Sequence, residues 1–444
     1  MARSLPRHAS PAALSLAALS LAGLLHCGGG GTTTGSTSGS STTATTGGSS
    51  STTSTTTTGA GGGSTTSTTT TGVGGSSTTS TTATTGNGGN GGNGGNGGNV
   101  GNGGFGGDPL DLDLDGDGWS VNEGDCCDTA GNCSAPELVN PGAFEYPGNG
   151  IDDDCDPSTL DNVALPSCSP AALITPTTSE DLIKAMDLCQ FVLESPPKPQ
   201  RKWGVIQTML LLADGNALPA PKDLQLGVLD NYGPNVLPKA GGTMAALSSG
   251  TARDVTDPGY VHPQNGTQGG QIGNYNANTN VSVPAPWLAA HGGVVPNPAN
   301  CPPCQGANCG KAFDSVNLKA RIRVPTNARS FSYALKFYTA EYPEFVCKQF
   351  NDFFITLLDS QWVPDPNAQP PQLPLPLDKN IAFDKQKNAV SVNNGFFEVC
   401  FASPQGMCPS GTLELVGTGM GGWGNNLQDG GGTEWLVNDA PVVP

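Results

Sequence analysis

The sequence predicts a mainly β protein, with a β-sandwich-like C-terminal domain containing one or two short helices, preceded by a small acidic loop module and a long disordered linker. The chain has 444 residues, with 64 Gly and 37 Pro, and only 13% of its residues are charged, about half the usual share of globular chains. The segment from Gly28 to Gly107 is uncharged and consists almost wholly of Gly, Ser, Thr and Asn. Beyond it, short alternating apolar runs are separated by Gly, Pro and Asn, a pattern typical of β domains.

Residues 1–26 are predicted to be a signal peptide. A basic start with Arg3 and Arg7 precedes an apolar run from Ala12 to Leu25, which is too short for a stable transmembrane helix. The run ends Leu-Leu-His-Cys27 and resembles a bacterial lipobox, which implies lipid attachment at Cys27. The alternative is an ordinary cleavage site at which Cys27 has no role. We therefore expect an exported protein, lipid-anchored in the outer membrane or at the cell surface.

Residues 27–107 are expected to form a disordered linker. A chain of small polar residues cannot bury enough apolar surface to offset the entropy of ordering it. By random-coil scaling such a segment spans about 50 Å on average. With a lipid at one end and a folded head at the other, it would act as a flexible stalk.

Charge and cysteine content limit the partners and the compartment. The net charge is −18, which argues against binding nucleic acid, because such binding needs a basic face. The same charge suits a cationic partner. Beyond Cys27 the chain has an even set of cysteines, which predicts disulfides in an oxidising compartment. The disulfide candidates are Cys126, Cys127, Cys133, Cys155, Cys168, Cys189, Cys301, Cys304, Cys309, Cys347, Cys400 and Cys408.

Residues 108–157 form an acidic module without Lys, Arg or His. It contains the stretch Asp113-Leu-Asp-Gly-Asp-Gly-Trp119, in which alternating Asp residues place oxygens on one side of a tight loop. Gly118 permits the sharp turn, and a backbone carbonyl can complete the ligand shell, as in the first half of an EF-hand. The twelfth loop position is Gly124 rather than Glu, so the last ligand must come from Glu123, Asp125 or Asp128.

A second acid-rich turn follows, from Asn140-Pro-Gly-Ala-Phe-Glu145 to Gly148-Asn-Gly-Ile-Asp-Asp-Asp-Cys-Asp156. Taken together, the two halves resemble the metal-binding motif of MopE-like bacterial surface proteins. The resemblance implies a small module that is stiffened by calcium and closed by a disulfide from Cys126 or Cys127 to Cys155. The candidate metal ligands are Asp113, Asp115, Asp117, Trp119, Glu123, Asp125, Asp128, Asp152, Asp154 and Asp156.

We expect the ion to be Ca2+. Carboxylates are hard oxygen ligands of the kind that calcium prefers. The MopE name carries an association with copper, but copper prefers imidazole or sulfur, and this segment has no His and cysteines that are expected to be oxidised. A third interpretation is an acidic loop that is merely solvated.

In the C-terminal domain, residues 158–444, a capping Ser179 and early acids precede apolar residues at helical spacing, which predicts a helix over 179–193. Residues 202–212 form either a second helix or a buried strand. Alternating residues predict strands at 318–324, 330–338 and 389–392. A Cys168–Cys189 disulfide would tie the helix to the body of the domain.

The stretch from Phe331 to Ile355, with Asn380-Ile-Ala and Val390-Ser-Val-Asn after it, resembles the choice-of-anchor L domain of secreted and surface-attached bacterial proteins. Gly227–Arg253 is similar to the early part of that domain, and Gly432–Leu436 to its late part. The resemblance implies a β-rich surface domain and no particular reaction. Domains of this type continue into further strands, so it also implies a truncated or differently closed domain here.

Other residues suggest chemistry less specifically. Glu341, Glu344 and Asp352 are candidates for a second calcium site or an acid–base pair, whereas the simpler interpretation is a turn and a cap. Cys301, Cys304, Cys309 and Cys347 are compatible with zinc, but disulfides suit an oxidising compartment better. The histidines expected in the mature chain, His262 and His291, lie far apart in sequence and support no catalytic triad.

We therefore predict a protein that is not an enzyme and that acts in calcium-dependent adhesion or surface scaffolding. Its membrane contact would be the lipid anchor, and its ligand an extracellular glycan or protein. The alternative is a secreted hydrolase that acts on polysaccharide or peptide through Glu341, Glu344 or Asp352.

Overall fold

The computed structural model describes residues 15–20 and 108–443, except for positions 132, 160, 162–167, 169–170, 173–177, 220–222, 261–279, 305–308, 344, 349–350, 395–396, 402–407 and 421–429. Cys27, the predicted linker 27–107, His262 and Glu344 lie outside the described residues. Strands dominate, and the α-helices are short: α1 is Ser179–Lys184 and α2 is Ala285–Ala290. This confirms the mainly β prediction. In the described part of the chain, no helix has the length and apolarity needed to cross a membrane.

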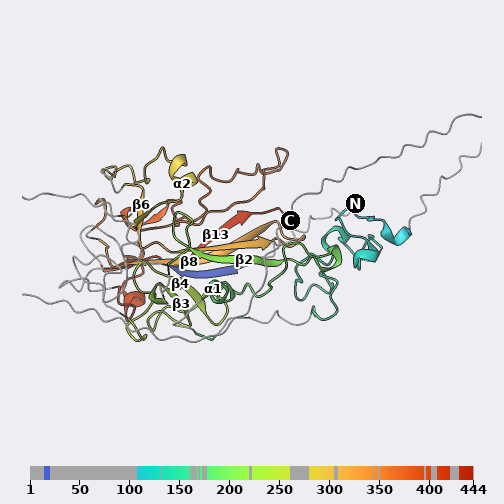
Figure 1. Cartoon of the computed structure of the whole chain (residues 1–444), viewed down its shortest axis with the longest axis horizontal. Coiled ribbons are helices and arrows are strands. Elements are labelled where there is room, and N and C mark those ends of the chain that lie inside the picture. The colour runs from blue at the N-terminus through green and yellow to red at the C-terminus, as the bar shows by residue number, and fades with distance from the viewer. Residues whose placement is uncertain are drawn as a thin grey trace, which may run out of the picture. The chain divides into compact units, whose positions relative to one another are not determined.

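The largest sheet has the strand order β11-β12-β8-β1-β4-β3, and β13 lies beside β8 (Figure 1). On one edge β8 pairs antiparallel with β13 and β12, and on its other edge it pairs parallel with β1. β4 pairs parallel with β1 and antiparallel with β3. The bounds are β1 Ser15–Ser20, β3 Leu226–Leu229, β4 Met244–Leu247, β8 Ser330–Thr339, β11 Val399–Cys400, β12 Gly431–Gly432 and β13 Leu436–Pro441.

A second layer is formed by the antiparallel pair of β2 (Gly204–Leu211) and β7 (Asn317–Arg323). Val205 of β2 packs in one apolar cluster with Leu182 of α1 and Val228 of β3, while Leu318 and Ile322 of β7 cover it. Fully burying one such aliphatic side chain contributes about 1.5–3 kcal/mol. The two layers and α1 therefore enclose one core, which is the sandwich-like arrangement that the alternating strands predict.

The remaining elements are short. β5 (Asn280–Ser282) pairs with β6 (Lys311–Phe313), and β9 (Phe353–Phe354) pairs with β10 (Val390–Ser391). The 3-10 helices are Pro109–Asp111, Val121–Glu123, Pro136–Leu138, Lys198–Gln200, Asp223–Gln225, Val392–Asn394 and Leu413–Leu415.

The predicted helix over 179–193 is too long. It begins at Ser179 as predicted, but the capping residue is Thr178 rather than Ser179. Thr178 and Asp181 form a reciprocal capping box, which satisfies free N–H groups of the first turn. The helix ends at Lys184, and Asp187 has a φ of 59°. The apolar residues beyond it, including Met186 and Leu188, are buried in the same cluster without being helical. Residues 202–212, left undecided by periodicity, contain the strand β2.

Twelve cysteines form six disulfides, and no cysteine of the described residues is free. The pairs are Cys126–Cys155, Cys127–Cys133, Cys168–Cys189, Cys301–Cys347, Cys304–Cys309 and Cys400–Cys408. The four cysteines considered as zinc ligands are thus paired with one another, and they offer no thiolate to a metal.

Close backbone packing at β12 generates a stability prediction. A Cβ added at Gly432 would lie 2.5 Å from two ring carbons of Tyr338, a side chain that is only 1% exposed and has no room to move. We expect Gly432→Ala to destabilise the fold by about 1–3 kcal/mol, because it overpacks the core. Denaturation with urea measures this. Gly250→Ala is the control, since its nearest contact would be 3.7 Å away; equal stability of both variants would contradict the packing at β12.

Candidate metal centre

The first acidic loop is built from Asp side chains that accept hydrogen bonds from the backbone just ahead of them. Asp113 accepts from the N–H groups of Gly116 at 2.7 Å and Gly118 at 2.9 Å. Asp115 accepts from Asp117 N–H at 3.1 Å. Gly116 and Gly118 have φ values of 83° and 96°, in the left-handed region that glycine adopts without steric cost. The alternation of Asp and Gly therefore winds the chain into a tight loop of carboxylates.

Two residues beyond the loop return to it. Asp128 accepts from Leu114 N–H at 2.6 Å, and Asp125 is held by Cys127 N–H at 2.8 Å. The result is two overlapping groups whose potential ligand atoms lie within 4.8 Å of one another, Asp113–Asp115–Asp128 and Asp115–Asp117–Asp125. Asp115 belongs to both groups.

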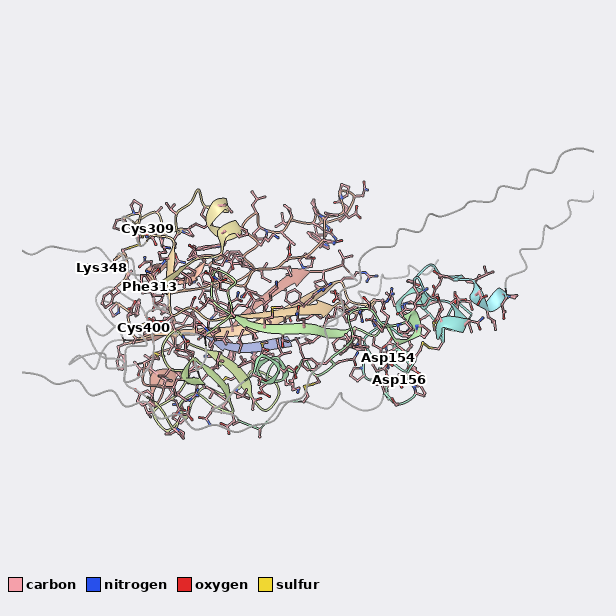
Figure 2. The ribbon with its side chains drawn as sticks, in the orientation of Figure 1. Asp154, Asp156, Cys309, Phe313, Lys348 and Cys400 are labelled. Carbon is pink, nitrogen blue, oxygen red and sulfur yellow. A yellow bond between two sulfur atoms is a disulfide. The ribbon has the colours of Figure 1, made fainter. Side chains whose placement is uncertain are left out.

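A third group, Glu145–Asp152–Asp154, lies in the second half of the module and meets the same 4.8 Å criterion. Glu145 is 3% exposed, and its Oε2 accepts from Asp153 N–H at 2.7 Å. Asp156 N–H donates to Asp154 Oδ1 at 3.1 Å, and Figure 2 shows these two side chains close together. The Cys126–Cys155 disulfide links this half of the module to the first loop.

The carboxylates of these groups repel one another, and all except Asp113 and Asp152 are at least partly buried. Burial is the main cause that raises the pKa of Asp125 to about 6, and the charges of Asp117 and Asp115 add to it. Burial likewise raises the pKa values of Asp115, Asp117, Glu145 and Asp152. Two unit charges 4.8 Å apart repel by about 3 kcal/mol at an effective dielectric constant of about 20. These groups therefore need a positive charge that their own side chains do not supply.

The donor set fits a hard divalent cation. Three buried oxygens of these groups, Asp115 Oδ2, Asp125 Oδ2 and Glu145 Oε1, have no hydrogen-bond partner in the protein. An unpartnered buried carboxylate oxygen is costly unless a cation or a proton satisfies it. All side-chain ligands in the three groups are carboxylates, the class that calcium and magnesium select over softer metals.

Several sequence candidates lie outside the three groups. Glu123 closes a capping box on Ser120 and binds Lys198 Nζ at 2.6 Å, and the Lys198 hydrogen bond lowers its pKa. Asp156 is bonded to Lys202, which lowers its pKa. The Trp119 side chain lies under Lys198 Nζ, and its backbone carbonyl, which would be the ligand, stays a prediction.

Glu145 is the group member that the sequence-based ligand set lacks. It is far from the Asp-rich loop in sequence and follows a turn of Pro, Gly and Ala. The sequence feature that could have identified Glu145 is its position as the acid at the end of that turn, within the stretch that resembles the metal-binding motif.

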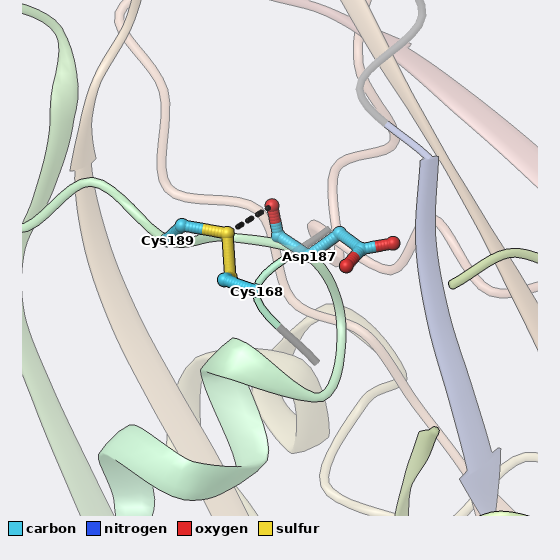
Figure 3. Close-up of side chains that lie close together, drawn as sticks. All are labelled: Cys168, Asp187 and Cys189. Atoms are coloured by element: carbon cyan, nitrogen blue, oxygen red, sulfur yellow. Dashed lines mark hydrogen bonds between the residues drawn. A yellow bond between two sulfur atoms is a disulfide. The ribbon is translucent and has the colours of Figure 1, made fainter. Parts of the chain in front are cut away.

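A further cluster, Cys168–Asp187–Cys189, meets the same distance criterion but does not fit a metal. Figure 3 shows the two cysteines joined in a disulfide, and the Asp187 carboxylate directed away from the sulfur atoms. The backbone oxygen of Asp187 lies 3.6 Å from Cys189 Sγ. Because the thiolate, and not a disulfide sulfur, is the metal ligand, this cluster does not form a metal site, and its disulfide has a structural role.

The carboxylates proposed for catalysis are deeply buried. Glu341 is 3% exposed and Asp352 is 1% exposed; Glu344 is outside the described residues. Thr339 Oγ1 donates to Asp352 Oδ2 at 3.4 Å and accepts from the backbone N–H of Glu341 at 3.1 Å. His291 is hydrogen-bonded to Asp378 at 2.9 Å, and its ring contacts the Trp287 ring edge-on. These side chains are tied into the core or to each other.

A family model described as “Putative metal-binding motif”, named for copper binding and MopE, matches residues 136–159. The matched span contains Glu145, Asp152, Asp154 and Cys155. No curated protein and no solved structure matches the chain. The chain therefore carries a metal-binding motif with acidic groups in a disulfide-rich fold, which is the character of an exported or surface protein. The resemblance to the choice-of-anchor L domain stays a prediction.

The shared position of Asp115 generates the first prediction about the site. We expect Asp115→Asn to lower calcium affinity by about tenfold or more, because it removes charge from two ligand groups at once. Isothermal titration calorimetry with calcium, on protein first stripped of metal by a chelator, measures this affinity. Glu137→Gln, an exposed acid of the same module, is the control. Equal affinities for the two variants would contradict the assignment of Asp115.

A second prediction concerns Glu341, whose burial raises its pKa from 4.5 to about 7. The unfolded chain ionises this group near 4.5, so the stabilisation from its bound proton is present below that pH and is lost as the pH rises through about 7. We expect Glu341→Gln to raise the melting temperature at pH 8 and to leave it unchanged at pH 4. The exposed Asp439→Asn is the control. A lower melting temperature for Glu341→Gln at pH 8 would contradict this interpretation.

Proposed function

We propose that this protein is a lipid-anchored bacterial surface protein whose acidic module binds calcium and thereby fixes the module against the β domain, making a rigid head for adhesion or scaffolding. The observation that carries the proposal is a direct hydrogen-bonded path from the first carboxylate loop to the β domain. Asn140 Nδ2 donates to Asp117 Oδ2 at 2.7 Å. Thr326 Oγ1, just beyond β7, donates to Asn140 Oδ1 at 2.7 Å.

Calcium is the ion that the donors support best. The side chains in the three groups are carboxylates, and the orphaned oxygens lie in both halves of the module. Copper prefers imidazole or sulfur donors, and the module's cysteines are engaged in disulfides. When bound, the ion would supply positive charge where the protein has none. The chain's own residues hold the loop in shape by backbone hydrogen bonds.

Further contacts join the module to the β domain. The side-chain amide of Asn327 binds the backbone of Phe144: its Oδ1 accepts from Phe144 N–H at 2.9 Å and its Nδ2 donates to Phe144 C=O at 2.8 Å. The Phe144 ring also packs against Trp203, with centroids 5.3 Å apart. Lys198 and Lys202 bind Glu123 and Asp156, but partly exposed ion pairs of this kind contribute only about 0–1 kcal/mol. The apolar and amide contacts therefore matter more, and a fixed Asp117 would hold them in place.

Burial of the candidate acids supports a protein without catalysis. A hydrolase needs carboxylates that reach the substrate, whereas Glu341 and Asp352 are almost fully enclosed. The lipid anchor is proposed from the sequence at Cys27. Mass spectrometry of the exported chain tests it: a diacylglycerol-modified Cys27 at the mature N-terminus supports the anchor, and an unmodified terminus elsewhere contradicts it.

The path through Asn140 predicts that Thr326→Val uncouples the two parts. The substitution conserves shape, removes the hydroxyl donor and leaves every candidate ligand in place. We expect unchanged calcium affinity but a smaller rise in melting temperature on adding calcium. The reason is that the hydrogen bond from Thr326 to Asn140, which links the β domain to the loop, is lost. Calorimetry on the full chain measures both. Thr208→Val, whose hydroxyl bonds Ser179 in the other part of the β domain, should keep the full rise, and identical behaviour of both variants would contradict the coupling.

Adhesion itself is tested with beads that carry the full chain and are mixed with bacterial cells. We expect attachment in calcium that EDTA reverses, strong attachment for Glu137→Gln, and attachment reduced several-fold for Asp115→Asn. Attachment that ignores EDTA would contradict a calcium-dependent adhesin. Release of soluble sugars or peptides from the cells, in amounts that grow with time, would favour the hydrolase instead.

A further inference from the structure

The antiparallel β2–β7 pair turns one face to the core and the other face outward. Leu318 and Ile322 of β7 pack against the apolar cluster that the pair covers. Because successive side chains of a strand point to opposite faces, the alternate residues Lys319, Arg321 and Arg323 lie on the outward face. Lys319 and Arg321 are exposed, and Arg323 is partly exposed. One strand therefore presents a row of three cations to solvent.

This row reverses the sign of the charge that the rest of the chain carries. The whole sequence has 19 Lys and Arg against 37 Asp and Glu. Arg201 adds a further cation from the segment before β2. Burial is the main cause that lowers the pKa of Arg323, and the charges of Arg201 and Arg321 add to it, so these guanidinium groups lie within reach of one another. We call Lys319, Arg321, Arg323 and Arg201 the basic face.

The contacts of two of these arginines hold them in place and neutralise little of their charge. Arg321 is bonded to Glu194, but both side chains of this ion pair are more than half exposed, at 56% and 59%, so water screens the attraction. Arg323 donates to the backbone carbonyls of Lys202, Leu193 and Glu194 at 2.8–2.9 Å. Carbonyl groups fix the position of a guanidinium without removing its charge.

The other two cations are not neutralised either. In the described part of the chain, neither Arg201 nor Lys319 forms an ion pair. Asp359 acts on Lys319 only weakly, because its carboxylate is bound to Lys379 Nζ at 2.6 Å. The hydrogen bond from Lys379 is the main cause that lowers the pKa of Asp359, and Lys319 adds the least to it. The basic face therefore has an excess of positive charge that suits an anionic partner.

The spacing of the cations favours an extended partner over a small anion. Alternate residues of an antiparallel strand lie about 7 Å apart, so the row on β7 spans about 14 Å. A small anion can contact only part of such a row, whereas a polymer with repeated anionic groups can contact all of it. The planar fork of an arginine binds a carboxylate through two parallel hydrogen bonds. Carboxylates repeated along a chain therefore match these side chains.

We propose that the basic face on the outward side of the β2–β7 pair binds a polysaccharide that carries carboxylates, such as a polymer of uronic acids. This names the ligand class for the adhesion proposed above, and it rests on that function for its biological role but not on calcium. DNA is a poorer match. It carries a charge about every 1.7 Å, and the net charge of −18 repels so dense a polyanion more strongly than a sparsely charged polysaccharide.

Titration of the full chain with hyaluronan oligosaccharides, which carry a carboxylate in each disaccharide repeat, tests the site. The titration is done in EDTA at low salt. We expect Lys319→Gln with Arg321→Gln to lower the affinity by about tenfold or more, because both removed charges face the ligand. The matched control is Lys239→Gln with Lys387→Gln, which changes the charge equally at exposed lysines elsewhere and should keep the affinity. No binding by the unchanged chain, or equal losses in both variants, would overturn the proposal.

A second variant gives a gain that misfolding cannot imitate. Glu194→Gln removes the negative charge beside Arg321, so we expect about threefold tighter hyaluronan binding. Glu137→Gln, an exposed acid of the module, should leave the affinity unchanged. Unchanged or weaker binding by Glu194→Gln would overturn the proposal, as would equal binding of neutral dextran or tighter binding of duplex DNA. Asp115→Asn should bind hyaluronan normally, which separates failure of this site from failure of the metal centre.

Discussion

The structure of the acidic module depends on one electrostatic constraint: carboxylates are gathered within a few ångströms of one another, and no basic side chain lies among the members of their groups. Desolvation and mutual repulsion raise the pKa values of Asp115, Asp117 and Asp125, which measures how poorly the protein alone accommodates their charge. Hydrogen bonds from the backbone fix the loop but leave buried oxygens without partners. A divalent cation would relieve both problems at once.

The same constraint explains how a small loop could influence a much larger domain. The module has few apolar residues of its own, and it is held by disulfides, by the Phe144–Trp203 contact and by amide hydrogen bonds to the end of β7. Because Asn140 contacts both Asp117 and Thr326, movement of the carboxylate loop would disturb the junction. Under the proposed function, neutralising the loop charge would therefore also favour the docked arrangement, by linkage between binding and folding.

Local patterns in the sequence predict much of this arrangement, whereas contacts between residues far apart in the sequence could not be predicted from them. The Asp and Gly alternation from Asp113 to Gly118 is a local code for a carboxylate loop. The start of α1 at Ser179 also follows from a local pattern of a hydroxyl residue and early acids, although the cap itself is Thr178. The early end of α1 could not be predicted, because tertiary burial of Met186 and Leu188 keeps an apolar spacing where the helix has stopped. Likewise, Glu123 and Asp156 form ion pairs with Lys198 and Lys202, which belong to a later segment. A run of acidic residues alone does not indicate that two of its members pair with lysines instead of joining the ligand groups.

The most direct test of the central claim is calorimetric titration of the full, chelated protein with calcium, combined with melting curves at each calcium concentration. We expect saturable binding and a melting temperature that rises with calcium, because the ion would bind the folded module and not the unfolded chain. Copper added in place of calcium should give no comparable rise. Absence of calcium binding, or binding that leaves the melting temperature unchanged, would contradict the claim that a cation completes this module.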